Sequence, residues 1–187
     1  NTEQWSYVAG VFYFFERASE YNLQRFTFVL PGGGAALNLS PVSSFGGETT
    51  SKAAFGQVSY RPAALAGKLE LTGGLRYTQD DKEFFSSLFL QPGNASSSNT
   101  SGLVSANYQF TDDVMGYARV STGYKAGGFS PRAPFLAKFD PEKATAYELG
   151  LKAEWFDRRL RTNLSLYQTD YKDLQVQQFQ SGTGGSV

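Results

Sequence analysis

Neither cysteine nor histidine occurs among the 187 residues. The missing cysteines exclude a disulfide framework and thiol chemistry. The missing histidines exclude Ser-His-Asp and Cys-His catalysis, histidine-ligated zinc and proton transfer by imidazole. Carboxylates could still catalyse a reaction, but no convincing pair of them stands out. We therefore expect no enzyme, no catalytic residue, no metal and no cofactor.

An excess of positive charge is also missing, because 17 Lys and Arg residues balance 17 Asp and Glu residues. A basic surface for nucleic acid is therefore not expected. No segment approaches the roughly 18 consecutive apolar residues of a transmembrane helix. The longest apolar stretch, residues 7–15, is long enough for only one strand.

Aromatic residues, by contrast, make up 16% of the chain although its mean hydropathy is only -0.34. Many aromatic side chains with little overall hydrophobicity suit a wall that is apolar on one side and wet on the other. The strands of a lipid-facing β-barrel alternate in this way, with apolar residues outward and polar residues inward.

A period of two between apolar and polar residues predicts seven strands. The clearest places Tyr147, Leu149 and Leu151 on one face and Glu148 and Lys152 on the other. Its length of about 11 residues suits a tilted strand that crosses a bilayer, whereas soluble strands average about 5–6. The predicted strands cover residues 3–16, 52–61, 68–80, 101–110, 114–125, 145–155 and 160–171.

The connections between these strands alternate in length. Those after the second, fourth and sixth strands are tight, and those after the first, third and fifth are long: residues 17–51, 81–100 and 126–143. Outer-membrane barrels have short periplasmic turns and long outer loops. Aromatic residues near the strand ends predict two interfacial girdles, namely Trp5, Tyr60, Phe110 and Trp155 on the periplasmic side and Tyr13, Phe15, Tyr77 and Tyr124 on the outer side.

Several segments resemble the barrel of TonB-dependent receptors, in order and spacing. They are LTGGLRYT at 71–78, YARVSTGYKAGGF at 117–129, PEK at 141–143, YELGLK at 147–152 and YQTDYKD at 167–173. Each phrase alone is weak, but the ordered set spans nearly the whole chain. The resemblance implies an all-β, antiparallel, up-and-down transmembrane β-barrel in the bacterial outer membrane, here about seven strands of about 22.

The resemblance also implies a gated importer of scarce, bulky solutes, most often iron–siderophore complexes, with energy from the inner-membrane TonB complex. The sequence shows no plug domain and no TonB-contacting box. We therefore expect residues 1–187 to be a fragment of the barrel domain, with the plug absent and the TonB contact made by a missing region. Seven strands would leave two open edges, which lipid does not tolerate.

Six residues are candidate solute contacts, because cations and aromatic rings in an outer loop or on the lumen wall could hold an anionic, ring-bearing siderophore. They are Phe129, Arg132, Phe135, Lys138, Arg119 and Lys125. The alternative for the four loop residues is an ordinary exposed loop, or one packed on its neighbours.

Charges on the polar faces have a plainer interpretation as cross-strand pairs. Arg119 and Glu148 on adjacent predicted strands could form one such pair. The aspartates at 80–81, 112–113, 170 and 173 lack the ligand spacing of a calcium loop, so we interpret them as solvated turn residues.

Two other functions remain open. A passive porin would share the wall without a plug. A soluble β-sandwich, such as a carbohydrate-binding module, would instead cover its apolar face with another protein sheet.

Overall fold

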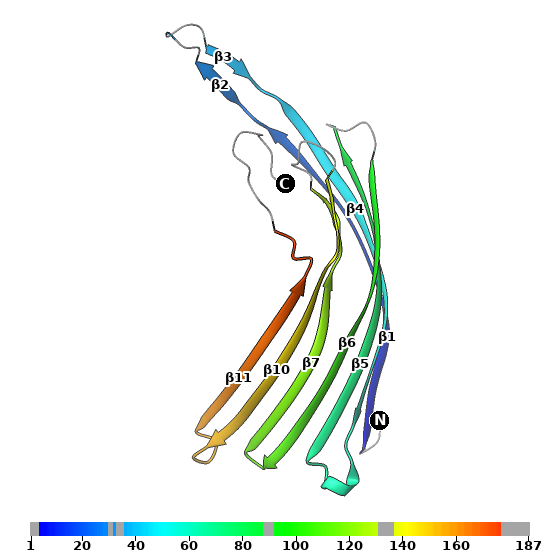
Figure 1. The fold of residues 1–187 in the computed structure, drawn as a ribbon, viewed down its shortest axis with the longest axis vertical. Helices are drawn as coiled ribbons and strands as arrows, with labels where there is room; N and C mark the ends of the chain where they lie inside the picture. Colours follow the sequence, from blue (N-terminus) through cyan, green and yellow to red (C-terminus); the bar gives the residue numbers. More distant parts are fainter. Residues whose placement is uncertain (1–3, 30–31, 33–35, 88–91, 131–136, 177–187) are drawn as a thin grey trace.

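The computed structural model describes residues 4–29, 32, 36–87, 92–130 and 137–176 (Figure 1). Seven long strands form one antiparallel sheet in the order β1-β4-β5-β6-β7-β10-β11, so each lies beside the next long strand in the chain. The predicted seven strands and their up-and-down order are confirmed, as a partial barrel. Their bounds are β1 Trp5–Leu23, β4 Val42–Tyr60, β5 Leu69–Ser86, β6 Gly93–Thr111, β7 Val114–Lys125, β10 Glu142–Trp155 and β11 Leu160–Lys172.

Tight connections join the strands at one end of the sheet, the lower end in Figure 1. The β4–β5 connection contains the one-turn 3-10 helix η1 (Ala63–Leu65). The β10–β11 turn contains three consecutive residues with positive φ, Phe156, Asp157 and Arg158, which reverses the chain within four residues. No helix in the described parts of the chain is long and apolar enough to span a membrane.

The first long connection is in large part strand, so its prediction as a loop is wrong. β1 and β4 stay paired without a register shift from Trp5 opposite Tyr60 to Leu23 opposite Val42. A further hairpin, β2 (Phe26–Val29) with β3 (Ala36–Leu39), continues this pair of strands above the rest of the sheet (Figure 1). The upper part of β1 and β4 together with this hairpin is called here the arm.

The other two long connections also contain paired backbone. β5 and β6 remain paired up to Phe84 opposite Gly93. The third connection contains the hairpin of β8 (Gly128–Ser130) and β9 (Ala137–Phe139). The sequence of these segments lacks the alternation of apolar and polar residues, as in Ser96–Asn99, but the backbone ladder continues through them.

One face of the sheet, called here the apolar face, is exposed. The exposed fraction is 67% for Leu75, 61% for Leu149 and 74% for Leu166. Among the described residues, the only buried hydrophobic side chains are Phe45, Ala53, Phe84 and Ala153. The leucine and tyrosine rows are therefore not enclosed in a protein core. An exposed apolar surface of this extent requires an apolar partner, and its exposed side chains include Leu71, Leu75, Tyr77, Val104, Val120, Tyr147, Leu149, Leu151, Leu164 and Leu166.

The opposite face, called here the polar face, carries Glu70, Arg76, Glu148 and the residues that alternate with the leucines. These three side chains are half-buried although they are long and charged. Side chains on the inner side of a curved sheet converge and shield one another, so the polar face is the concave one. The sheet curves visibly in Figure 1.

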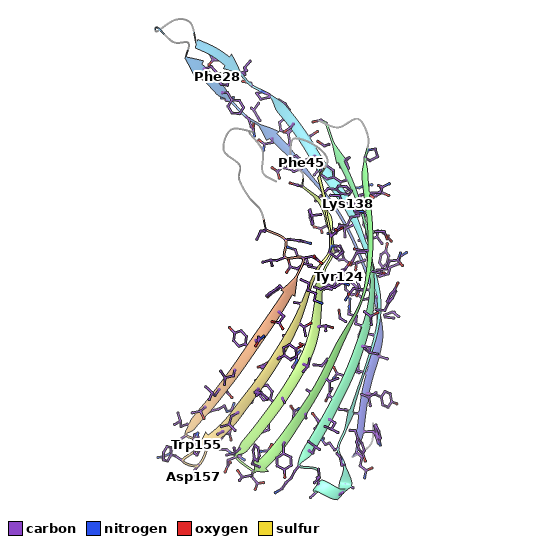
Figure 2. All side chains as sticks on the ribbon, viewed as in Figure 1. Phe28, Phe45, Tyr124, Lys138, Trp155 and Asp157 are labelled. Atoms are coloured by element: carbon purple, nitrogen blue, oxygen red, sulfur yellow. The ribbon has the colours of Figure 1, made fainter. Side chains whose placement is uncertain are left out.

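Aromatic residues mark the lower end of the apolar face. The rings of Trp5 and Tyr60 lie 4.3 Å apart, and Trp155 lies beside the β10–β11 turn (Figure 2). At the upper end, Tyr77 is exposed as predicted, but Tyr124 is half-buried and its hydroxyl donates to Ser97 Oγ at 2.6 Å. Tyr124 therefore does not belong to an outward-facing girdle.

Candidate solute-facing wall

Carboxylates near the lower end of the polar face are paired with arginines. Arg61 Nη2 lies 2.5 Å from Glu70 Oε2, and Asn107 Nδ2 donates to the same carboxylate at 3.2 Å. Glu154 contacts Arg161 across the β10–β11 pair at 2.5 Å and Arg158 in the turn at 3.2 Å. For Glu70 and Glu154 the structure therefore supports the interpretation as cross-strand pairs.

Higher on the wall, a tyrosine takes the place expected for an arginine. Arg119 lies directly opposite Glu148 in the register of β7 and β10. Glu148 Oε1, however, accepts a hydrogen bond from the Tyr117 hydroxyl at 2.6 Å, and within the described residues Arg119 makes no ion pair. The register is as expected, but the expected Arg119–Glu148 ion pair is not formed.

A glycine explains how Tyr117 reaches Glu148. Tyr117 stands opposite Gly150, and a Cβ added to Gly150 would lie 2.2 Å from the tyrosine ring. The ring therefore occupies the space that a side chain at Gly150 would take, and its hydroxyl reaches the carboxylate. Lys152 Nζ lies 5.6 Å from the centroid of the same ring, which adds a cation–π contact.

A second aromatic cluster holds Arg76. Its guanidinium carbon lies 5.1 Å from the centroid of the Phe12 ring and 5.9 Å from that of Phe55, and Arg76 Nε donates to Thr78 Oγ1 at 3.1 Å. Gly10 makes room for Phe55, since a Cβ there would lie 2.7 Å from the ring. Sequence reasoning missed this cluster. The signal was present, because both phenylalanines occupy polar-face positions in the period-two pattern.

Two of the predicted loop residues lie in the β8–β9 hairpin. Phe129 stands opposite Lys138 in this hairpin. The Phe129 ring stacks on Phe84 of β5 with centroids 5.9 Å apart, so the hairpin packs against the sheet. Lys138 is exposed near the level of Phe45 in Figure 2. The alternative of a connection packed on its neighbours therefore describes Phe129.

The other predicted contacts are separated along the wall. Lys125 is exposed at the upper end of β7, opposite Glu142, whereas Arg119 lies six positions lower on the same face. Arg132 and Phe135 lie outside the described residues. The structure thus shows no single cluster of the four described candidates. In the described ranges, no three acidic residues are grouped so that they could hold a metal ion.

A family model for the β-barrel of TonB-dependent-receptor-like proteins matches residues 1–187. The chain belongs to this family. The similar structures named below are import and uptake receptors, and the family forms β-barrels of the outer membrane. Family membership, together with the exposed apolar rows, excludes the soluble β-sandwich.

The pesticin receptor of Yersinia pestis is 32% identical to the chain over 147 residues, and the match covers 73% of the chain and 21% of that receptor. The pesticin receptor of Yersinia enterocolitica is 31% identical over the same length, with the same coverage. The chain therefore spans about a fifth of the length of the curated relatives it matches.

Solved structures show the same fold at lower identity. The ferric yersiniabactin uptake receptor FyuA from Yersinia pestis superposes with a TM-score of 0.69 at 21% identity, covering 94% of this chain and 27% of that one. The ferric-catecholate import receptor Fiu from E. coli K12, in its open form, gives 0.61 at 16% identity, covering 92% and 29%. BauA, the ferric preacinetobactin receptor from Acinetobacter baumannii, gives 0.59 at 21% identity, covering 88% and 26%.

Proposed function

We propose that this chain is part of the barrel wall of an outer-membrane receptor that imports a ferric siderophore with energy from the TonB complex. The exposed apolar face contacts lipid, and the concave polar face lines the lumen. The missing part of the protein supplies the remaining strands, the plug and the TonB contact. The observation that carries the proposal is the separation of the two faces, within a chain of this receptor family.

The siderophore assignment is supported by the solutes that receptors of the same fold import. Receptors for ferric yersiniabactin, ferric catecholates and ferric preacinetobactin share this fold. All three are receptors for ferric siderophores, which supports the same class of solute for this chain.

An uptake assay in living cells tests this function. The intact receptor is expressed in a strain that lacks its own siderophore receptors, and growth is measured under iron chelation with catecholate, hydroxamate and phenolate siderophores in turn. We expect at least one class to restore growth and radio-iron uptake, and we expect deletion of tonB to abolish both.

A passive porin predicts a different result. It would admit small sugars at the same rate with and without tonB and would not concentrate iron. Uptake that survives the deletion of tonB would therefore reject the receptor in favour of the porin.

A further inference from the structure

Two lysines face each other across the upper ends of β10 and β11. Lys143 is the direct cross-strand partner of Lys172, and both side chains are exposed. Like charges that stand directly opposite each other on a sheet repel and destabilise it. An anion beside the two ammonium groups would offset this repulsion.

The protein around Lys143 does not supply that anion. On its other side Lys143 stands opposite Tyr124 of β7. The adjacent carboxylate of Glu142 belongs to the opposite face of β10, and its Oε2 accepts from the backbone N–H of Gln175 at 3.0 Å.

One acidic residue, Asp170, shares this face of β11, two positions before Lys172. Its carboxylate accepts a hydrogen bond from Gln168 Nε2 at 3.0 Å. Within the described residues, neither Lys143 nor Lys172 makes an ion pair. The charge that offsets the two lysines therefore comes from outside the described part of the chain.

The lysine pair lies on the apolar face, at its outer end. β10 and β11 are paired without a register shift, so Lys143 shares a face with Tyr147 and Leu149. In Figure 2, Trp155 marks the lower end of β10, and Tyr124, the partner of Lys143, marks the upper end.

The height of the pair corresponds to the layer of lipid headgroups. Lys143 is four residues beyond Tyr147 on the outer side. At about 3.3 Å per residue and a strand tilt of about 40°, these residues span about 10 Å along the membrane normal. Tyrosines mark the edge of the hydrocarbon, so the lysines reach the level at which lipid phosphates lie.

We propose that Lys143 and Lys172 bind the phosphate group of a lipid in the outer leaflet. The two ammonium groups hold the phosphate as point charges, and the acyl chains of the lipid lie on the apolar face below them. The inference rests on the proposed function, which places the apolar face in the lipid of the outer membrane.

Native mass spectrometry of the intact receptor measures its affinity for lipid A, a phosphorylated glycolipid. We expect Lys143→Gln and Lys172→Gln each to weaken binding about fivefold, and the double variant about thirtyfold. The double arginine variant keeps both charges and should stay within about twofold of the wild type. Inorganic phosphate at the same concentration should not compete, because it has no acyl chains to place on the apolar face.

A control pair removes the same charge from the opposite end of the sheet. Lys68 and Arg159 are both exposed at the lower end. Lys68→Gln with Arg159→Gln should change lipid A affinity by less than about twofold, because these charges lie beyond the range of an outer-leaflet phosphate.

Urea titration in vesicles distinguishes a lipid phosphate from a carboxylate on the missing neighbour of β11. In phosphatidylcholine alone, Lys172→Gln should leave the unfolding midpoint unchanged or raise it, since it removes a repulsion. Addition of lipid A should raise the midpoint of the wild type more than that of the variant, because the wild type binds the lipid more tightly.

Lipid A affinity that is unchanged in the double glutamine variant, or lowered equally in the control pair, would overturn the lipid site. A lower midpoint for Lys172→Gln in phosphatidylcholine alone would do the same, because a protein carboxylate would then already neutralise the pair. Siderophore-dependent iron uptake is measured on the same variants. Intact TonB-dependent uptake with lysine-independent lipid binding would reject the lipid site and leave the receptor function standing. Lysine-dependent lipid binding without any TonB-dependent uptake would reject the receptor function instead.

Discussion

The two faces of the sheet differ in what their side chains contact. On the apolar face, the side chains of Leu149 and Leu151 are exposed. On the polar face, Glu148, one residue away, accepts a hydrogen bond from Tyr117, and Lys152 lies over the same ring. Successive residues of one strand thus point to opposite faces and lie in two different environments.

We expect the largest effect from a charge placed on the apolar face. Leu151→Arg in the intact receptor places a charge where the proposal puts hydrocarbon, and should lower the free energy of unfolding by roughly 2–4 kcal/mol if the site is near the bilayer midplane. Lys152→Arg, on the adjacent polar-face position, is the matched control and should be nearly silent. Denaturant titration in lipid vesicles measures both. Equal losses in the two variants would mean that lipid does not contact the apolar face.

A smaller effect tests the close packing of the polar face. Gly150→Ala places a methyl group where the Tyr117 ring lies, so the ring must move and its hydrogen bond to Glu148 is lost. We expect a destabilisation of about 1–3 kcal/mol, typical of overpacking. Gly73→Ala on the apolar face meets nothing within 4 Å and should change stability by less than about 0.5 kcal/mol. The same titration compares them, and a larger loss for Gly73→Ala would reverse the assignment of crowded and open faces.

The smallest effect concerns the exposed ion pairs. Glu154→Gln removes the carboxylate that contacts Arg161 and Arg158, whose side chains are 71% and 73% exposed. Water and salt screen such pairs, so each should contribute about 0.2–1 kcal/mol. A double-mutant cycle with Arg161→Gln isolates one pair. A coupling well above that range would show that this end of the wall is shielded from water in the intact receptor.

Much of the sheet could be predicted from the sequence, because each long strand separates two environments and therefore carries a period-two pattern. The strand ends could not. The prediction ended the first strand at Glu16, although β1 continues to Leu23. At Arg17 a charge appears on the face that is apolar below, and Arg17 Nε donates to Glu48 Oε1 of β4 at 2.8 Å. Above that level both faces can meet water, so hydrophobic periodicity no longer reports the strand.

The contacts on the wall were less predictable than its register. Arg119 and Glu148 stand opposite each other on adjacent strands, as a cross-strand pair requires, but Tyr117 reaches the carboxylate instead because Gly150 leaves space for its ring. This exchange of partners, Tyr117 in place of Arg119, depends on the absence of a side chain on the neighbouring strand. The pairing of Arg76 with Phe12 likewise joins residues from strands that are not adjacent, which a pattern within one strand does not contain.

The unbroken ladder between β1 and β4 also limits how this protein can change in length over evolution. Inserting one residue into either strand would turn every side chain beyond it to the opposite face. Of the nineteen cross-strand pairs, all those beyond the insertion would be mismatched. Matched insertions in both strands avoid this, as do insertions beyond Val29 and Ala36, the last pair of the β2–β3 hairpin. Differences among relatives in the length of this arm should therefore arise by insertions at its tip, or by insertions of equal length in both paired strands.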